Sequence, residues 1–143
     1  MEEIDFTLNR NLDKNQILRL TDCSWITKRK NILFTGPTGI GKSFIAQALG
    51  YQACLLGYRT GYFQTMKYFK NLKYARSENT YLQEMKKLQK LQLIILDDLG
   101  LEPFDAAARL SLLEILEDRY NRASTIIVSQ IPISRWHEII VDQ

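Results

Sequence analysis

A glycine-rich octapeptide between two apolar segments constrains this chain more than any other feature. It fits the pattern G-x-x-x-x-G-K-[ST], a loop whose backbone N–H groups surround a phosphate because glycine has no Cβ to block the approach. The octapeptide is Gly36, Pro37, Thr38, Gly39, Ile40, Gly41, Lys42 and Ser43. In this pattern the lysine contacts the outer phosphates and the serine hydroxyl can coordinate Mg²⁺. The pattern predicts a nucleotide site that also includes the next residue, Phe44.

The segments on either side of the loop have the character that this motif requires. Residues 31–35 form an apolar run of strand length, and residues 44–56 have apolar side chains at helical spacing before Gly57. A strand, a loop and a helix in this order direct the positive end of the helix dipole at the bound phosphate. The alternative is a chance glycine-rich turn, and the flanking segments argue against it.

Strand-like and helix-like segments alternate along the rest of the chain. Further apolar runs of strand length cover residues 91–96 and 124–129, and residues 59–64 have a strand-like centre at Tyr62 and Phe63. Helical spacing covers 14–20, 66–76, 81–90 and 105–121. Residues 1–11 are polar and are expected to be irregular. This alternation predicts an α/β fold with four parallel strands flanked by helices.

Two local expectations concern the helices. Thr65 is expected to cap the helix that follows it, and Asp105 to open the helix that ends near residue 121. The buried face of that last helix is expected to contain Leu110, Leu113, Leu116 and Tyr120.

Two acidic residues follow the apolar run 91–96. Asp97 can hold Mg²⁺ together with Ser43, and Asp98 can orient or deprotonate an attacking water. A helix cap or a solvated turn is the alternative for such an acidic pair. Because the carboxyl ends of parallel strands meet at one edge of a sheet, we expect the pair to lie in the pocket of the glycine-rich loop.

The run 124–129 also ends in polar side chains. Gln130, or its neighbour Ser129, could reach the γ-phosphate or the attacking water, although a simple turn before Pro132 is the alternative. Lys42, Asp98 and Gln130 are therefore the candidate catalytic residues. The lone histidine, His137, is expected to be a surface or packing residue.

Length and composition limit the remaining possibilities. At 143 residues, with 45% hydrophobic and 24% charged residues, the chain is expected to be one globular domain. Its two cysteines are too few for a disulfide framework. No apolar run reaches the roughly 18 residues of a membrane span, and no signal peptide is visible, so a cytoplasmic location is expected.

Basic residues recur on one predicted helix. Lys67, Lys70 and Lys73 are spaced by three, with Tyr68 and Tyr74 between them, and Arg76 ends the run. Basic stripes with aromatic residues suit nucleic-acid backbones, whereas the alternative is a solvated helix face. Two further basic groups, Lys28-Arg29-Lys30 and Lys86, Lys87, Lys90, have the same two interpretations.

Four blocks of the sequence, residues 36–43, 93–100, 117–132 and 134–138, resemble the IstB-like ATPases. These are AAA+ proteins of the P-loop NTPase (ASCE) class that assist insertion-sequence transposases and are related to DnaC-type helicase loaders. The resemblance implies that Lys42 and Ser43 belong to Walker A, Asp97 and Asp98 to Walker B, and Gln130 or Ser129 to the first sensor. It also implies ATP with Mg²⁺, homo-oligomers, DNA, and a transposase or replicative helicase as partner.

The chain departs from this family at both ends. We expect residues 1–143 to be one AAA+ core domain, with 1–30 as a lead-in segment and without the C-terminal strand and lid. Arg119, Arg122 and Arg135 are then the nearby substitutes for the arginine that a neighbouring subunit supplies, and none matches that motif position. Nucleotide binding is therefore predicted more firmly than hydrolysis.

Three other functions remain open from the sequence. A GTPase would use Asp97-x-x-Gly100, but no N-K-x-D motif follows. A small-molecule kinase would need an arginine-bearing lid and an acceptor pocket, for which no segment is evident. A nucleotide-binding module without turnover is the main alternative to an ATPase.

Overall fold

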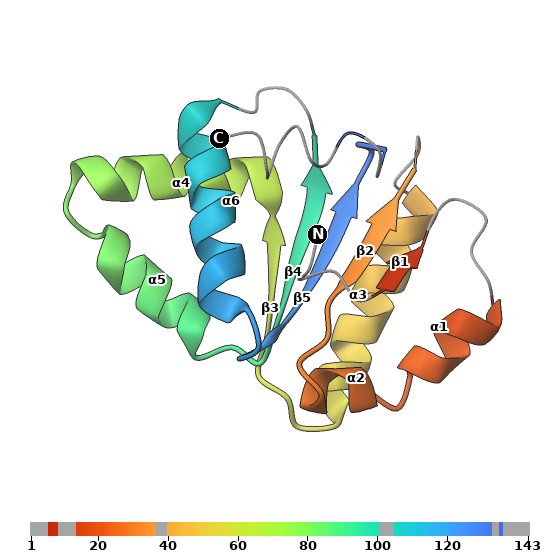
Figure 1. Ribbon diagram of the computed structural model, residues 1–143. Coiled ribbons are helices and arrows are strands. Elements are labelled where there is room, and N and C mark those ends of the chain that lie inside the picture. Colours follow the sequence, from red (N-terminus) through yellow and green to blue (C-terminus); the bar gives the residue numbers. More distant parts are fainter. Residues whose placement is uncertain (1–5, 9–13, 37–39, 101–104, 133–134, 136–143) are drawn as a thin grey trace.

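Five parallel strands form one sheet in the computed structural model (Figure 1). The structure describes residues 6–8, 14–36, 40–100, 105–132 and 135. The strands are β1 (Phe6–Leu8), β2 (Ile32–Thr35), β3 (Thr60–Gln64), β4 (Leu93–Leu99) and β5 (Ser124–Ser129). Their order across the sheet is β1-β2-β5-β4-β3, so β5 lies between the two strands that the sequence assigns to nucleotide chemistry. The predicted parallel α/β fold is confirmed.

Six helices cover the sheet in the described part of the chain. They are α1 (Lys14–Leu20), α2 (Ser24–Thr27), α3 (Ile40–Leu55), α4 (Thr65–Ser77), α5 (Tyr81–Gln89) and α6 (Ala106–Arg119). Buried residues of α1, α2 and α3 share one apolar cluster, and buried residues of α4, α5 and α6 share the other. The sheet therefore has helices on both faces, and none of these helices is long and apolar enough to cross a membrane.

Continuous apolar strands result from this double cover. In β4, Leu93 and Ile95 belong to the cluster of α1–α3, whereas Ile94 and Leu96 belong to the cluster of α4–α6. Every residue of β5 is buried. A strand that is buried on both faces has no polar side, which is why the runs 91–96 and 124–129 lack alternation.

The expectation of an irregular segment over residues 1–11 is wrong at β1. Phe6 pairs with Ile32 and Leu8 with Phe34, so β1 is a parallel edge strand beside β2. A three-residue strand is too short to show a periodic pattern in the sequence. β1 pairs with the side of β2 that does not face β5. Only the tertiary structure reveals this pairing.

The predicted helix starts are half right. The Asp105 side chain accepts a hydrogen bond of 2.8 Å from the backbone N–H of Ala108, so the expected cap of α6 is confirmed. The cap of α4 is Gln64 and not Thr65, because the Gln64 side chain accepts from the N–H of Lys67 at 2.8 Å. Thr65 is instead the first residue of α4 and is buried.

The predicted face of α6 is also wrong in part. Leu110 and Tyr120 are 48% and 43% exposed. The buried residues of this helix are Ala108, Ser111, Leu112, Ile115, Leu116 and Arg119. The leucines of α6 lie on more than one face of the helix, so their spacing in the sequence does not identify the buried face.

Arg119 connects the end of α6 to two other elements. Its guanidinium donates to Thr125 Oγ1, to the carbonyl of Leu88 and to the carbonyl of Ser124, at 3.1, 3.0 and 2.8 Å. Burial lowers the pKa of Arg119 to about 10, so the group keeps its charge at neutral pH. It fixes the start of β5 against α5 and α6, and it is not available as an arginine for a neighbouring subunit.

We predict that Arg119→Lys destabilises the fold by about 2 kcal/mol, because one ammonium cannot reach the three acceptors of the guanidinium. Urea denaturation measures this change. Arg122→Lys is the matched control, since Arg122 is exposed and pairs with Asp118 at 3.1 Å, and we expect a change below about 0.5 kcal/mol. Equal losses in both variants would contradict the role assigned to Arg119.

Candidate nucleotide site

The carboxyl ends of the strands lie side by side at one edge of the sheet (Figure 1). Thr35 at the end of β2 pairs with Ser129 of β5, and Leu99 of β4 also pairs with Ser129. The backbone N–H of Gly36 donates to the Ser129 carbonyl at 3.2 Å, and Gly36 adopts a φ of 151°, which favours glycine. The chain thus turns from β2 into the glycine-rich loop directly beside the end of β5.

One contact joins the loop to the acidic strand. Ser43, in the first turn of α3, donates from its hydroxyl to Asp97 Oδ1 at 2.7 Å. The contact joins the start of α3, which follows β2, to β4, although β5 lies between β2 and β4. Ser43 and Asp97, 54 residues apart in the sequence, are therefore in direct contact, and their binding of a metal stays a prediction.

These two oxygens fit a magnesium ion. Hydroxyl and carboxylate oxygens are its preferred ligands, and adjacent ligands of an octahedral ion with bonds of 2.0–2.1 Å lie about 2.9 Å apart. Ser43 Oγ and Asp97 Oδ1 are separated by 2.7 Å. Magnesium sites of nucleotide enzymes take one or two protein oxygens plus phosphates, and no cluster of three metal-ligating residues occurs in the described part of the chain.

The structure covers only part of the loop itself. Pro37, Thr38 and Gly39 lie outside the described residues, and Ile40 is described only as the first residue of α3. Lys42 is 4% exposed and belongs to the first turn of α3, next to Gly41. Phe44 is 74% exposed at the same end of the helix. Contact of these residues with a nucleotide stays a prediction.

Tyr62 is a site residue that the sequence analysis missed. Its hydroxyl donates to Asp97 Oδ2, the oxygen that Ser43 does not contact, and it accepts from Gln47 Nε2 at 3.3 Å. Although Tyr62 is 47% exposed, partial desolvation of its hydroxyl, together with the hydrogen bond to Asp97, raises the pKa of Tyr62 to about 12, so the phenol keeps its proton at neutral pH. Both oxygens of Asp97 are therefore held by hydroxyl donors, one from α3 and one from β3.

No sequence pattern marks Tyr62, because its role depends on register. Gln64 pairs with Asp97 in the sheet, and Tyr62 lies two residues earlier on the same strand. Side chains two residues apart on a strand point to the same face. A tyrosine in a predicted strand is the only hint that the sequence offers. It points to Asp97 only once the strand order shows that β3 lies beside β4.

The acidic pair lies within β4, not after it as predicted. Hydrogen bonding continues to Leu99, with a register shift between Leu96 and Leu99, and Asp98 adopts a φ of 59°. Neighbouring residues of a regular strand point to opposite faces, and a bulge re-aims the extra residue. Asp98 is exposed, and its Oδ2 accepts from Gln64 Nε2 at 3.3 Å.

The two sensor candidates differ in their surroundings. Ser129 is buried, and its hydroxyl donates to the Leu99 carbonyl at 2.7 Å and accepts from the N–H of Ile131 at 2.9 Å. Gln130 directly follows the end of β5 and is exposed. The hydroxyl of Ser129 is thus used to hold the ends of β4 and β5 together, which leaves Gln130 as the better sensor candidate.

The basic residues of α4 fall into two groups. Lys67 and Lys70 are exposed, and they have no ion pair among the described residues. Lys73 lies 3.5 Å from Asp105, while Arg76 pairs with Glu114 and stacks 3.8 Å above the Tyr81 ring. DNA binding by the four stays a prediction, and the geometry favours Lys67 and Lys70 because Arg76 joins α4 to α5 and α6.

Comparison with known proteins identifies the family. The family described as IstB-like ATP binding protein matches residues 1–143. The chain belongs to the IstB-like ATP-binding proteins. It is 46% identical over 139 residues to an insertion sequence ATP-binding protein of Sinorhizobium fredii, a match that covers 97% of this chain and 57% of the relative. It is 40% identical over 134 residues to the IS1162 ATP-binding protein of Pseudomonas fluorescens, covering 94% and 58%. This IstB-like chain thus spans little more than half the length of these relatives.

Solved structures share the parallel α/β fold of this chain. A DnaC helicase loader is similar with a TM-score of 0.71 at 22% identity, over 90% of this chain and 74% of that one. DnaI is similar with a TM-score of 0.73 at 16% identity, over 98% and 85%. DnaA of Aquifex aeolicus, bound to AMPPCP, gives 0.71 at 17% identity, over 88% and 39%. At these identities the likeness concerns the fold.

We predict that Tyr62→Phe weakens Mg²⁺ binding, because the carboxylate of Asp97 loses the donor that orients it. The Mg²⁺ concentration that half-saturates ATP binding should rise by about tenfold. Titration of Mg²⁺ against a fluorescent ATP analogue measures this directly and needs no turnover.

Tyr58→Phe is the matched control, because it removes a tyrosine hydroxyl that bonds Thr27 Oγ1 at 2.6 Å, away from Asp97. The control should bind Mg²⁺ and nucleotide as the unchanged protein does. A Tyr62→Phe variant with unaltered magnesium titration would show that Ser43 alone suffices to place Asp97.

Proposed function

We propose that this IstB-like chain is a magnesium-dependent ATPase module that acts on DNA together with a transposase or a replicative helicase. The observation behind the proposal is the 2.7 Å contact between Ser43 and Asp97. It unites the phosphate-binding loop with the acidic strand across β5, as a nucleotide–metal site requires. A chance glycine-rich turn does not require a contact between a hydroxyl and a carboxylate at the sheet edge.

Each residue of the site has a role in this proposal. The loop of residues 36–43 surrounds the phosphates, Lys42 offsets their charge, and Ser43 and Asp97 supply two ligands to magnesium. The ion, when bound, neutralises charge on the β- and γ-phosphates. Asp98 accepts the proton of the attacking water or orients it, and Gln130 contacts the γ-phosphate or that water from the end of β5.

Partners follow from the family and from the surface. The relatives named above belong to insertion sequences, and a solved DnaA structure of similar fold contains AMPPCP and single-stranded DNA, with a TM-score of 0.69. In this chain, Lys67 and Lys70 on α4 offer two exposed cations close to the carboxyl edge of the sheet. In this proposal the chain also forms homo-oligomers, in which a second copy lies next to the bound nucleotide.

A nucleotide-binding module without turnover is the second candidate. Arg119 is internal and Arg122 pairs with Asp118, so these two arginines serve this chain's own fold. An arginine supplied from elsewhere accelerates related NTPases by about 10³–10⁵. Without such a group, binding would persist while hydrolysis slows.

Steady-state ATP hydrolysis separates the two candidates. We expect magnesium-dependent turnover that DNA stimulates, and we expect Asp98→Asn to lower it at least 100-fold with ATP affinity retained, because the amide cannot accept the proton. Turnover that is absent with and without DNA, in a protein that still binds ATP, would leave the binding module as the function. Equal affinity for GTP would revive the GTPase interpretation.

For the α4 surface, we predict that the double substitution Lys67→Glu and Lys70→Glu weakens DNA binding by about tenfold or more and reduces its salt dependence by one to two ions. Fluorescence anisotropy at several salt concentrations measures both. Lys86→Glu with Lys90→Glu, on and after α5, makes the same change of net charge. If both double variants lose the same affinity, the effect is net charge and not a site on α4.

A further inference from the structure

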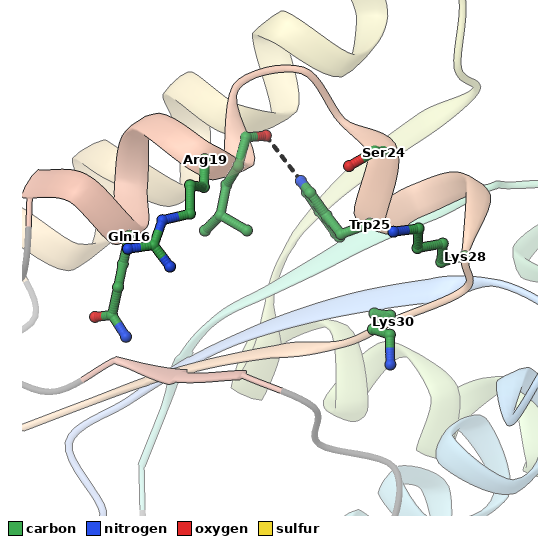
Figure 2. Close-up of a pocket in the computed structure, with 7 residues that line it drawn as sticks. Gln16, Arg19, Ser24, Trp25, Lys28 and Lys30 are labelled. Atoms are coloured by element: carbon green, nitrogen blue, oxygen red, sulfur yellow. Dashed lines mark hydrogen bonds between the residues drawn. The ribbon is translucent and has the colours of Figure 1, made fainter.

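A hollow lies at the opposite end of β2 from the phosphate-binding loop. It has a volume of about 240 Å³ and is lined by α1, α2 and the segment that leads into β2. Figure 2 shows Gln16 and Arg19 on one side and Trp25, Lys28 and Lys30 on the other. We call it the α1–α2 pocket. Because its residues precede β2 while the loop follows the carboxyl end of β2, it is separate from the nucleotide site.

Positive charge is concentrated around the α1–α2 pocket. Arg19, Lys28 and Lys30 line it, and no acidic side chain from the described ranges does. Residues 14–30 include five basic residues and one acidic residue, an excess that is larger than the net charge of +3 of the whole chain. The acidic residue is Asp22, and its carboxylate accepts from the N–H of Ser24 at 2.9 Å at the start of α2.

The walls of the pocket are held by contacts within the fold. Trp25 is 3% exposed, and its indole N–H donates to the Leu20 carbonyl at 2.8 Å, as the dashed line in Figure 2 marks. The turn between α1 and α2 is fixed to α3 by a hydrogen bond of 3.2 Å from Gln52 Nε2 to the Thr21 carbonyl. The cations therefore extend from a scaffold that is ordered by packing, which lowers the entropic cost of binding.

We propose that the α1–α2 pocket binds a phosphodiester group of a nucleic-acid backbone. Lysine and arginine, with neutral donors such as Gln16 and Ser24, form the usual partners of backbone phosphate oxygens. A phosphodiester is small enough for a recess of about 240 Å³. An acidic protein surface would use a wider interface with an apolar centre, but the apolar residues here, Leu20 and Trp25, are already buried.

This site rests on the proposed DNA partner and adds a contact that the α4 surface does not include. It also gives a role to Lys28 and Lys30, which the sequence could place only as a phosphate-contacting or a solvated turn. Contacts of this kind set affinity and register on the nucleic acid and do not read its sequence. The pocket should therefore bind DNA of any sequence.

The test is a paired neutralisation, Arg19→Gln with Lys28→Gln, in the full chain. Both side chains are exposed, and neither is part of the nucleotide site. Binding of a single-stranded oligonucleotide and of a duplex is measured by anisotropy between about 50 and 200 mM salt. We expect the affinity to fall about tenfold or more and the salt slope to shrink by about two, with ATP binding and melting temperature unchanged.

Lys86→Gln with Lys90→Gln is the control for loss of two charges, and Arg19→Lys keeps the charge while changing the shape. The proposal is overturned if the paired variant binds DNA like the unchanged protein, if it loses no more affinity than the control, or if Arg19→Lys loses as much as the neutral variant.

Two further outcomes separate this proposal from the proposed function. If the unchanged protein binds no DNA at all, both fail, whereas unchanged binding by the paired variant removes the pocket alone. Polyglutamate is the remaining probe. If it binds the unchanged protein and not the paired variant, while DNA binding stays the same, the pocket belongs to an acidic protein surface and the proposal is overturned.

Discussion

The position of β5 is the constraint on which the rest of the structure depends. It pairs with β2 on one side and with β4 on the other, and every one of its residues is buried. Its beginning is held by Arg119 and by Asn31, whose side chain accepts from the N–H of Thr125 at 2.8 Å, and its end by Ser129. Because β5 fixes the distance between β2 and β4, it also fixes where the loop helix α3 stands relative to Asp97.

The nucleotide site is assembled from three elements, α3, β3 and β4, around the carboxylate of Asp97. Ser43 from α3 and Tyr62 from β3 donate to the two oxygens of Asp97, and Gln47 from α3 supports Tyr62 in turn. A carboxylate with both oxygens held loses little rotational freedom when a cation arrives, so part of the ordering cost is met by folding. The register shift in β4 sets the neighbouring Asp98 apart from this network.

Positive charge is distributed unevenly over the fold. The cations of α4 are partly used for internal pairs, as in Arg76 with Glu114 and Lys73 with Asp105. Residues 14–30 contain one acidic residue, Asp22, whose carboxylate accepts from the N–H of Ser24 at the start of α2 and lies within the electrostatic influence of Lys28. The two basic surfaces lie near opposite ends of the strands, which makes them separable by mutation.

The sequence by itself determined the phosphate-binding loop, the parallel α/β class and most strands and helices, because these depend on local spacing: a motif of eight residues, apolar runs of strand length, and Asp105 as a cap. It also placed Ser43 and Asp97 in one pocket, since carboxyl ends of parallel strands meet. Only the tertiary structure decided the strand order, the short edge strand β1, the bulge at Asp98, the internal role of Arg119 and the place of Tyr62. Each of these depends on which strand pairs with which and in what register, and residues distant in the chain settle that through packing.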